Sequence, residues 1–160
     1  METLKMFSKN LGISFLVYFV LCVLGALCLL LRNIATRVPN VVLDPPRSTP
    51  WWVEIILWLH VLGSIALYFY FGTRVKQMSN RFLSFFSVSG NLLLGFVVIF
   101  SWISSEPYLI MLGGLSFIRL TILLGDGFNN EYIAILIVTI LPTIIIWLGM
   151  LYKAKRLVMD

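Results

Sequence analysis

The sequence predicts an all-α integral membrane protein with four transmembrane helices and a short re-entrant or interfacial helix between the third and the fourth. Hydrophobic residues make up 60% of the 160 positions and charged residues 12%, whereas soluble domains are about half apolar and about one quarter charged. Apolar runs long enough to cross a bilayer recur along the chain. Lys and Arg stand mainly at the ends of these runs. We expect residues 1–160 to form a single membrane domain.

The first predicted span is the uncharged run 11–31, which follows Lys5 and Lys9. As a helix it would rise about 30 Å, the thickness of the hydrocarbon core. A short basic segment before an apolar run is also typical of a signal peptide. This run is too long for one and lacks a small-residue cleavage site, so we expect it to be retained.

The second predicted span, residues 52–71, carries aromatic residues at both ends. Tryptophans stand at its beginning and Tyr68 and Tyr70 near its end, as is typical of helices whose ends lie among lipid headgroups. A proline-rich connection precedes this span, and a short basic loop separates it from the third predicted span, residues 82–102. The last predicted span covers residues 132–152.

The apolar stretch 108–124 is the ambiguous part of the chain, because it contains Arg119. As a helix this stretch would rise about 26 Å, and an arginine at the centre of the bilayer costs about 2.5–3.5 kcal/mol on insertion scales. We therefore expect a re-entrant or interfacial helix here. The alternative is a fifth span.

The distribution of basic residues favours four spans with both termini in the cytoplasm, most simply at the plasma membrane. In that arrangement most Lys and Arg residues are cytoplasmic, namely Lys5, Lys9, Arg74, Lys76, Arg81, Lys153, Lys155 and Arg156. The extracytoplasmic ones are fewer: Arg32, Arg37, Arg47 and Arg119. Arg32 and Arg37 directly follow the first span, which counts against this orientation. The net charge of +5 comes from basic residues that stand mainly at the ends of apolar runs. This position predicts that they face the anionic headgroups of a bilayer and do not bind nucleic acid.

Arg119 is the first candidate functional residue. An arginine at this depth needs a carboxylate, backbone carbonyls or a headgroup phosphate as its partner. In the four-span arrangement the candidate acids near the same interface are Glu54, Glu106, Asp126 and Glu131. Two interpretations stay open: a site for an anion, a lipid headgroup or a substrate carboxylate, and a structural ion pair or snorkelling arginine.

His60 is the only histidine of the chain. It would serve as a proton relay, as a haem or metal ligand for which a second chain supplies the other ligands, or as a hydrogen-bonded residue between helices. A closed metal site needs several ligands, so we expect no cofactor. In the third predicted span, Ser87, Asn91 and Gly95 follow one another at a spacing of four residues. Small and amide side chains on one helix face predict a packing seam, either inside the protein or towards a partner.

The motifs of the common enzyme families are absent from the sequence: it holds no phosphate-binding loop, dinucleotide fingerprint, HExxH motif or paired CxxC. We therefore expect a non-catalytic accessory, assembly or regulatory subunit of a larger membrane complex, bound to a membrane-protein partner or to a second copy. One alternative is an oligomeric transporter or channel protomer that uses His60, Asn91 or Arg119. Another is an interfacial enzyme that acts on a lipid or lipid-linked substrate, with Arg119 on a phosphate and Glu106, Asp126 or Glu131 as acid or base.

Overall fold

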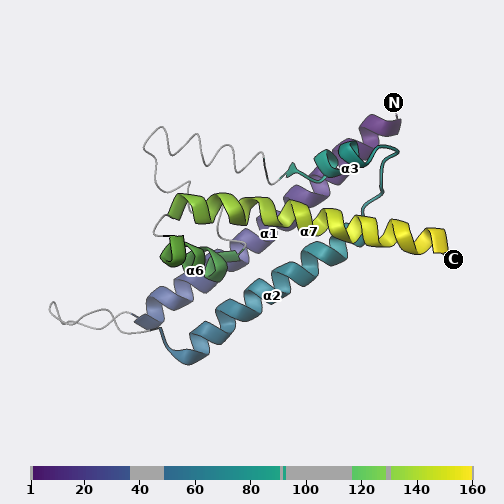
Figure 1. Cartoon of the computed structure of the whole chain (residues 1–160). Coiled ribbons are helices and arrows are strands. Elements are labelled where there is room, and N and C mark those ends of the chain that lie inside the picture. The colour runs from purple at the N-terminus through teal and green to yellow at the C-terminus, as the bar shows by residue number, and fades with distance from the viewer. Residues whose placement is uncertain (1, 37–48, 91, 93–116, 129–130, 160) are drawn as a thin grey trace.

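The computed structural model of the chain describes residues 2–36, 49–90, 92, 117–128 and 131–159. Over these residues the only regular elements are helices, which confirms the predicted all-α class. In chain order they are α1 (Glu2–Thr36), α2 (Trp51–Arg74), α3 (Arg81–Ser87), α6 (Ile118–Phe128) and α7 (Glu131–Met159). In Figure 1, α1 and α2 run side by side in opposite directions, α7 crosses α2 obliquely, and α6 lies beside the first half of α7.

Three of the described helices are long and apolar enough to cross a membrane: Glu2–Thr36, Trp51–Arg74 and Ile137–Lys155. They contain or largely overlap the first, second and fourth predicted spans. The first helix begins well before its apolar run, because Lys5 and Lys9 are good helix formers and continue the helix towards the chain start. The described part of the chain therefore has the helices of an integral membrane protein.

The third predicted span, residues 82–102, falls only partly on described residues. Its beginning is α3, which follows Asn80. The Asn80 side chain accepts a hydrogen bond of 2.8 Å from the backbone N–H of Phe82 and so caps the helix. Ser84 and Ser87 of this helix are buried. After residues 88–90, the remainder of the span, with Asn91 and Gly95, lies outside the described residues apart from residue 92.

The ambiguous stretch contains the start of α6. This helix begins at Ile118 and continues beyond residue 124 to Phe128, whereas residues 108–116 lie outside the description. Its 11 residues rise about 16 Å, roughly half of the hydrocarbon core. α6 packs against α7 and α2, and Arg119 lies in its first turn.

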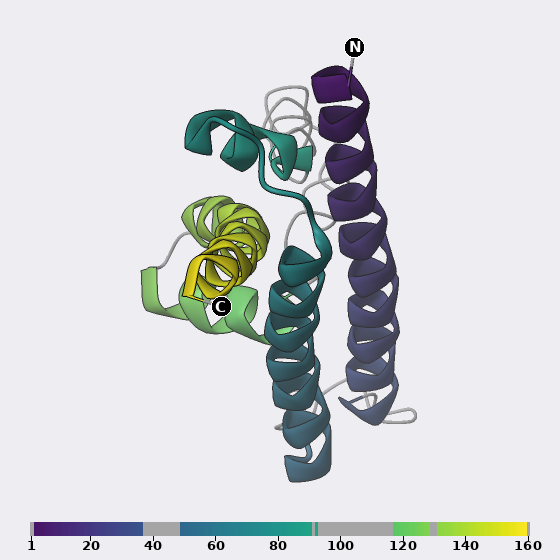
Figure 2. The same ribbon diagram turned by 90° about the vertical axis from the view of Figure 1, so that its right-hand side faces the viewer.

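The core is built around α2, which lies between α1 and α7 in Figure 2. The buried residues of α2 recur every three or four positions and form one stripe: Val53, Leu57, Val61, Ser64, Tyr68 and Gly72. Most outward side chains of α1 and α2 are large and apolar, among them Leu16, Phe19, Leu59 and Leu62. This is the pattern expected of helices whose outer surface is solvated by lipid.

α2 and α7 make backbone contact where they cross. A Cβ atom placed on Gly72 would meet the carbonyl group of Ile146, and one placed on Gly149 would meet the carbonyl group of Phe69. Small residues allow membrane helices to approach this closely. The rings of Phe69 and Tyr152 then pack beside the crossing with centroids 5.7 Å apart.

The N-terminal part of α1, the connection from α2 to α3, and the C-terminal part of α7 lie at the same end of the molecule, on the right of Figure 1. We call this the basic end. Its basic residues are Lys5, Lys9, Arg74, Lys76, Arg81, Lys153 and Lys155. The opposite end, where α1 ends and α2 begins, holds Arg32, Glu54 and Arg119, and we call it the mixed-charge end.

Candidate functional site

The centre of the mixed-charge end is an ion pair between α6 and α2. Nε of Arg119 lies 2.7 Å from Oε2 of Glu54, and the two side chains are 20% and 31% exposed. The contact is an ion pair without the alignment of a linear hydrogen bond. In the described part of the structure, Glu54 is the candidate acid that contacts Arg119. Glu106 and the side chains of Asp126 and Glu131 lie outside the description.

The guanidinium of Arg119 also lies over an aromatic ring of α2. Its Cζ atom is 5.8 Å from the ring centroid of Trp58, a cation–π contact that contributes about 0.5–1 kcal/mol at a partly exposed site. Trp58 stands four residues after Glu54 and so lies on the same face of α2. Two successive turns of one helix thus hold the same guanidinium, one through charge and one through a π face.

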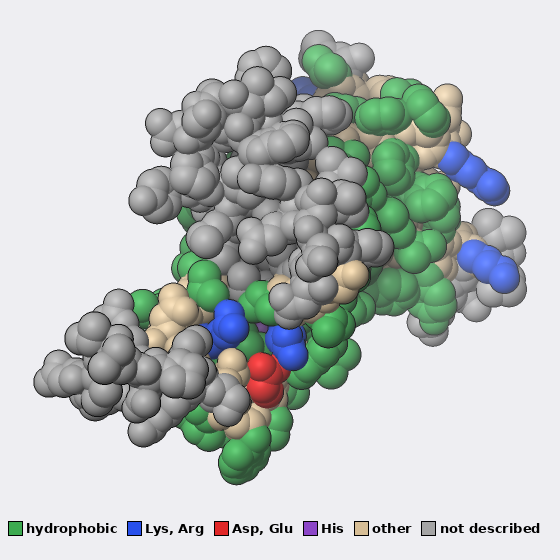
Figure 3. Space-filling model, turned by 60° about the vertical axis from the view of Figure 1, so that its left-hand side comes forward, with side chains coloured by type: hydrophobic (Ala, Val, Ile, Leu, Met, Phe, Trp, Pro, Cys, Tyr) green, Lys and Arg blue, Asp and Glu red, His purple; other side chains and the backbone are tan. Residues whose placement is uncertain are grey.

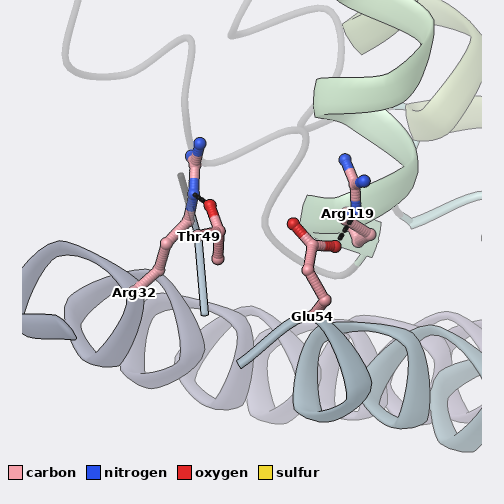
Figure 4. A network of polar contacts seen from close by, with 4 residues as sticks. All are labelled: Arg32, Thr49, Glu54 and Arg119. Atoms are coloured by element: carbon pink, nitrogen blue, oxygen red, sulfur yellow. Dashed lines mark hydrogen bonds and ion pairs between the residues drawn. The ribbon is translucent and has the colours of Figure 1, made fainter. Parts of the chain in front are cut away.

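A second arginine lies beside this pair. Nε of Arg32, near the end of α1, donates a long hydrogen bond of 3.4 Å to Oγ1 of Thr49. Figure 4 shows the guanidinium groups of Arg32 and Arg119 on the same side of α1 and α2, with Thr49 and Glu54 between them. The terminal nitrogens of both arginines point away from these two helices. In Figure 3 an acidic side chain lies beside basic ones at this end, and further basic side chains lie at the opposite end.

His60 connects α2 to α1. Its Nε2 atom lies 3.2 Å from the carbonyl oxygen of Leu21. A carbonyl oxygen can only accept, so Nε2 carries the hydrogen. Nδ1 is buried and has no hydrogen-bond partner among the residues that the structure describes. Within the same residues no group of three or more His, Cys, Asp or Glu side chains could hold a metal ion. The bond from His60 to Leu21 joins two helices, which is one of the interpretations that the sequence left open.

Ser87, the first residue of the predicted seam, packs inside the protein. The side-chain amide of Asn10 in α1 donates to its hydroxyl oxygen over 3.2 Å and lies 3.0 Å from the carbonyl oxygen of Lys76. Ser84 supports the same region, because its hydroxyl accepts from the backbone N–H of Met78 at 2.9 Å. A Cβ atom on Gly90 would lie 3.0 Å from Oγ of Ser14. The described part of the seam therefore faces α1.

Sequence reasoning missed several residues of these two ends. Asn10 directly precedes the first predicted span, and a lone amide at the head of an apolar run is a signal for helix contact. Trp58 could have been found from its spacing to Glu54. Thr49 gave no signal, because its contact with Arg32 depends on the path of the proline-rich connection.

Comparison with known proteins finds no family model, no curated protein and no solved structure that matches this chain. Function is therefore inferred from its own residues and contacts. Among the described residues, polar contacts join helices at both ends of the molecule, and His60 makes a further one between α2 and α1. The region around Arg119 combines partial exposure with charge, whereas the region around Asn10 is buried and neutral.

Proposed function

We propose that this protein is a non-catalytic integral membrane protein that acts as an accessory, assembly or regulatory subunit of a larger membrane complex. The supporting observation is that His60, Ser87 and Arg119, which the sequence singles out, each contact another element of their own chain. His60 joins α2 to α1, Ser87 joins α3 to α1, and Arg119 joins α6 to Glu54 of α2. Because these groups hold the helices together, the lipid-facing apolar surface is what remains for a membrane-protein partner.

The proposed topology has four spans, with both termini in the cytoplasm and the protein in the plasma membrane. The basic end supports this orientation, because the segments of α1, α7 and the connection after α2 that lie at this end (Figure 1) carry lysines in the sequence, and cytoplasmic loops are rich in Lys and Arg. α3 lies at the basic end, where Ser87 contacts Asn10. α6 lies at the mixed-charge end, where Arg119 contacts Glu54. We therefore propose one further crossing between α3 and α6, which brings the total to four.

The experiment that tests this function is purification of the tagged full chain from its native membrane in mild detergent. We expect a larger membrane protein to be recovered with it in a stoichiometric amount, because apolar helix surfaces are the proposed contact. Variants with shortened outward side chains would then locate the contact: Phe19→Ala with Leu27→Ala on α1, and Leu59→Ala with Leu62→Ala on α2, all exposed in the isolated chain. Loss of the partner in one pair alone identifies the docking helix.

Recovery of the chain alone, as a monomer or homo-oligomer, would contradict the accessory proposal. The transporter and the interfacial enzyme would then be the functions to test. In that case Arg119 and His60 would be substituted first, with ion or substrate flux and lipid turnover as the measured activities.

A further inference from the structure

We infer that Arg32 and Arg119 together form a binding site for a phosphate oxyanion at the mixed-charge end of the molecule. The ligand is either the headgroup of an anionic phospholipid or a soluble phosphate. This site is separate from the proposed docking surface, because it uses charged groups at the end of the helices and not their apolar sides.

Both arginines use the same edge of their guanidinium group within the chain. Nε of Arg119 faces Glu54, and Nε of Arg32 donates to Thr49. No hydrogen bond joins the Nη atoms of either arginine to any residue that the structure describes. In Figure 4 these terminal nitrogens lie on one side of α1 and α2 and point in the same direction. Two guanidinium groups presented in this way match an oxyanion, which accepts paired N–H groups from arginine.

The charge balance of the cluster favours an anion. The carboxylate of Glu54 neutralises one of the two guanidinium groups. The cluster of Arg32, Thr49, Glu54 and Arg119 therefore carries a net positive charge. The same carboxylate, together with the ring of Trp58, fixes the orientation of Arg119 before any ligand arrives. A side chain that is already held in place loses less conformational entropy on binding.

The depth of the cluster matches the phosphate groups of a bilayer. Trp51 and Trp52, 75% and 41% exposed, stand at the start of α2, and tryptophans collect at the level of the headgroups. Arg32 directly follows the apolar run of the first span, and Glu54 lies within one turn of Trp51. Basic residues at this level attract anionic headgroups.

The test uses the full chain reconstituted in nanodiscs of phosphatidylcholine mixed with phosphatidylglycerol. Transfer to a non-ionic detergent, followed by native mass spectrometry, gives the ratio of retained phosphatidylglycerol to phosphatidylcholine. We expect Arg32→Gln combined with Arg119→Gln to lower this ratio about tenfold, because hydrogen bonds between charged groups are lost. The control is Arg74→Gln combined with Lys76→Gln, which removes the same charge from the basic end and should lower the ratio much less, because it removes only general attraction to anionic lipid.

A second arm separates the two sources of phosphate. Inorganic phosphate is titrated into the detergent-solubilised protein, and the thermal unfolding midpoint is measured. An upward shift that the Arg32→Gln/Arg119→Gln variant loses assigns a soluble phosphate, whereas retention of phosphatidylglycerol without such a shift assigns the lipid headgroup. The site would be overturned if wild type and variant retained the two lipids in the same ratio and showed the same phosphate-induced shift of the unfolding midpoint. If Arg119→Gln prevents folding, the single variant Arg32→Gln decides, because Thr49 is the only described hydrogen-bond partner of Arg32. A reduction of the lipid ratio by about threefold supports the site. An unchanged lipid ratio rejects it.

Discussion

The two ends of this molecule hold their helices together by different means. At the basic end, the amide of Asn10 and the hydroxyl groups of Ser84 and Ser87 make buried, neutral hydrogen bonds. At the mixed-charge end, partly exposed charged side chains meet in the Arg119–Glu54 pair. Neutral buried bonds depend on geometry and packing, whereas contacts between exposed charges are weakened by salt. The two ends should therefore respond differently to substitution and to salt.

The largest expected effect is at the α2–α7 crossing near the basic end. Gly72→Leu places a side chain against the backbone of Ile146 and should lower the free energy of unfolding by about 3 kcal/mol, as overpacking does. Gly63→Leu in the same helix is the matched control, because nothing lies within 4 Å of its Cβ position. Unfolding in mixed detergent micelles measures both variants. Equal stability of the two would disprove the close crossing.

A smaller effect is expected at Asn10. Asn10→Ala removes the donor to Lys76 and Ser87 and should destabilise the protein by about 1–2 kcal/mol. The control is Asn33→Ala, an exposed position of the same helix. Because the bonds at Asn10 are neutral and buried, the difference between the two variants should not change with salt concentration. A difference that disappears in high salt would show that the basic end is held by charge after all.

The smallest effect is expected for the Arg119–Glu54 pair. A double-mutant cycle with Glu54→Gln and Arg119→Gln should give a coupling energy of about 0.5–1 kcal/mol, since both side chains are partly exposed. Raising the NaCl concentration to about 1 M should reduce the coupling, because the Debye length then falls to about 3 Å. A coupling that is large and insensitive to salt would mean that this end is also a buried structural network.

The helices at the first, second and fourth predicted spans were predictable because their signal is carried by each run alone. The uncharged run 11–31 is long enough to cross the bilayer wherever it packs. The ends of the helices were less predictable. α1 extends from Glu2 to Thr36, since helix propensity, and not hydrophobicity, decides where the polar flanks stop.

The contacts of the candidate site were predictable only in kind. A membrane arginine implies a partner, and Glu54 was among the acids considered for Arg119. The choice among those acids depends on how α6 packs against α2, which no local pattern records. For His60 the acceptor is the backbone oxygen of Leu21. Because every residue has such an oxygen, the identity of this partner could not have been predicted from the sequence.

The glycine crossing of α2 and α7 also dictates an order of assembly. Membrane helices insert individually and associate afterwards. α2 is synthesised before α7, which contains Gly149. The face of α2 around Gly72 therefore stays in lipid without its partner until α7 has been inserted. A ribosome that stalls before α7 leaves an incomplete bundle, and quality-control proteases in the membrane would meet it as an unfolded substrate.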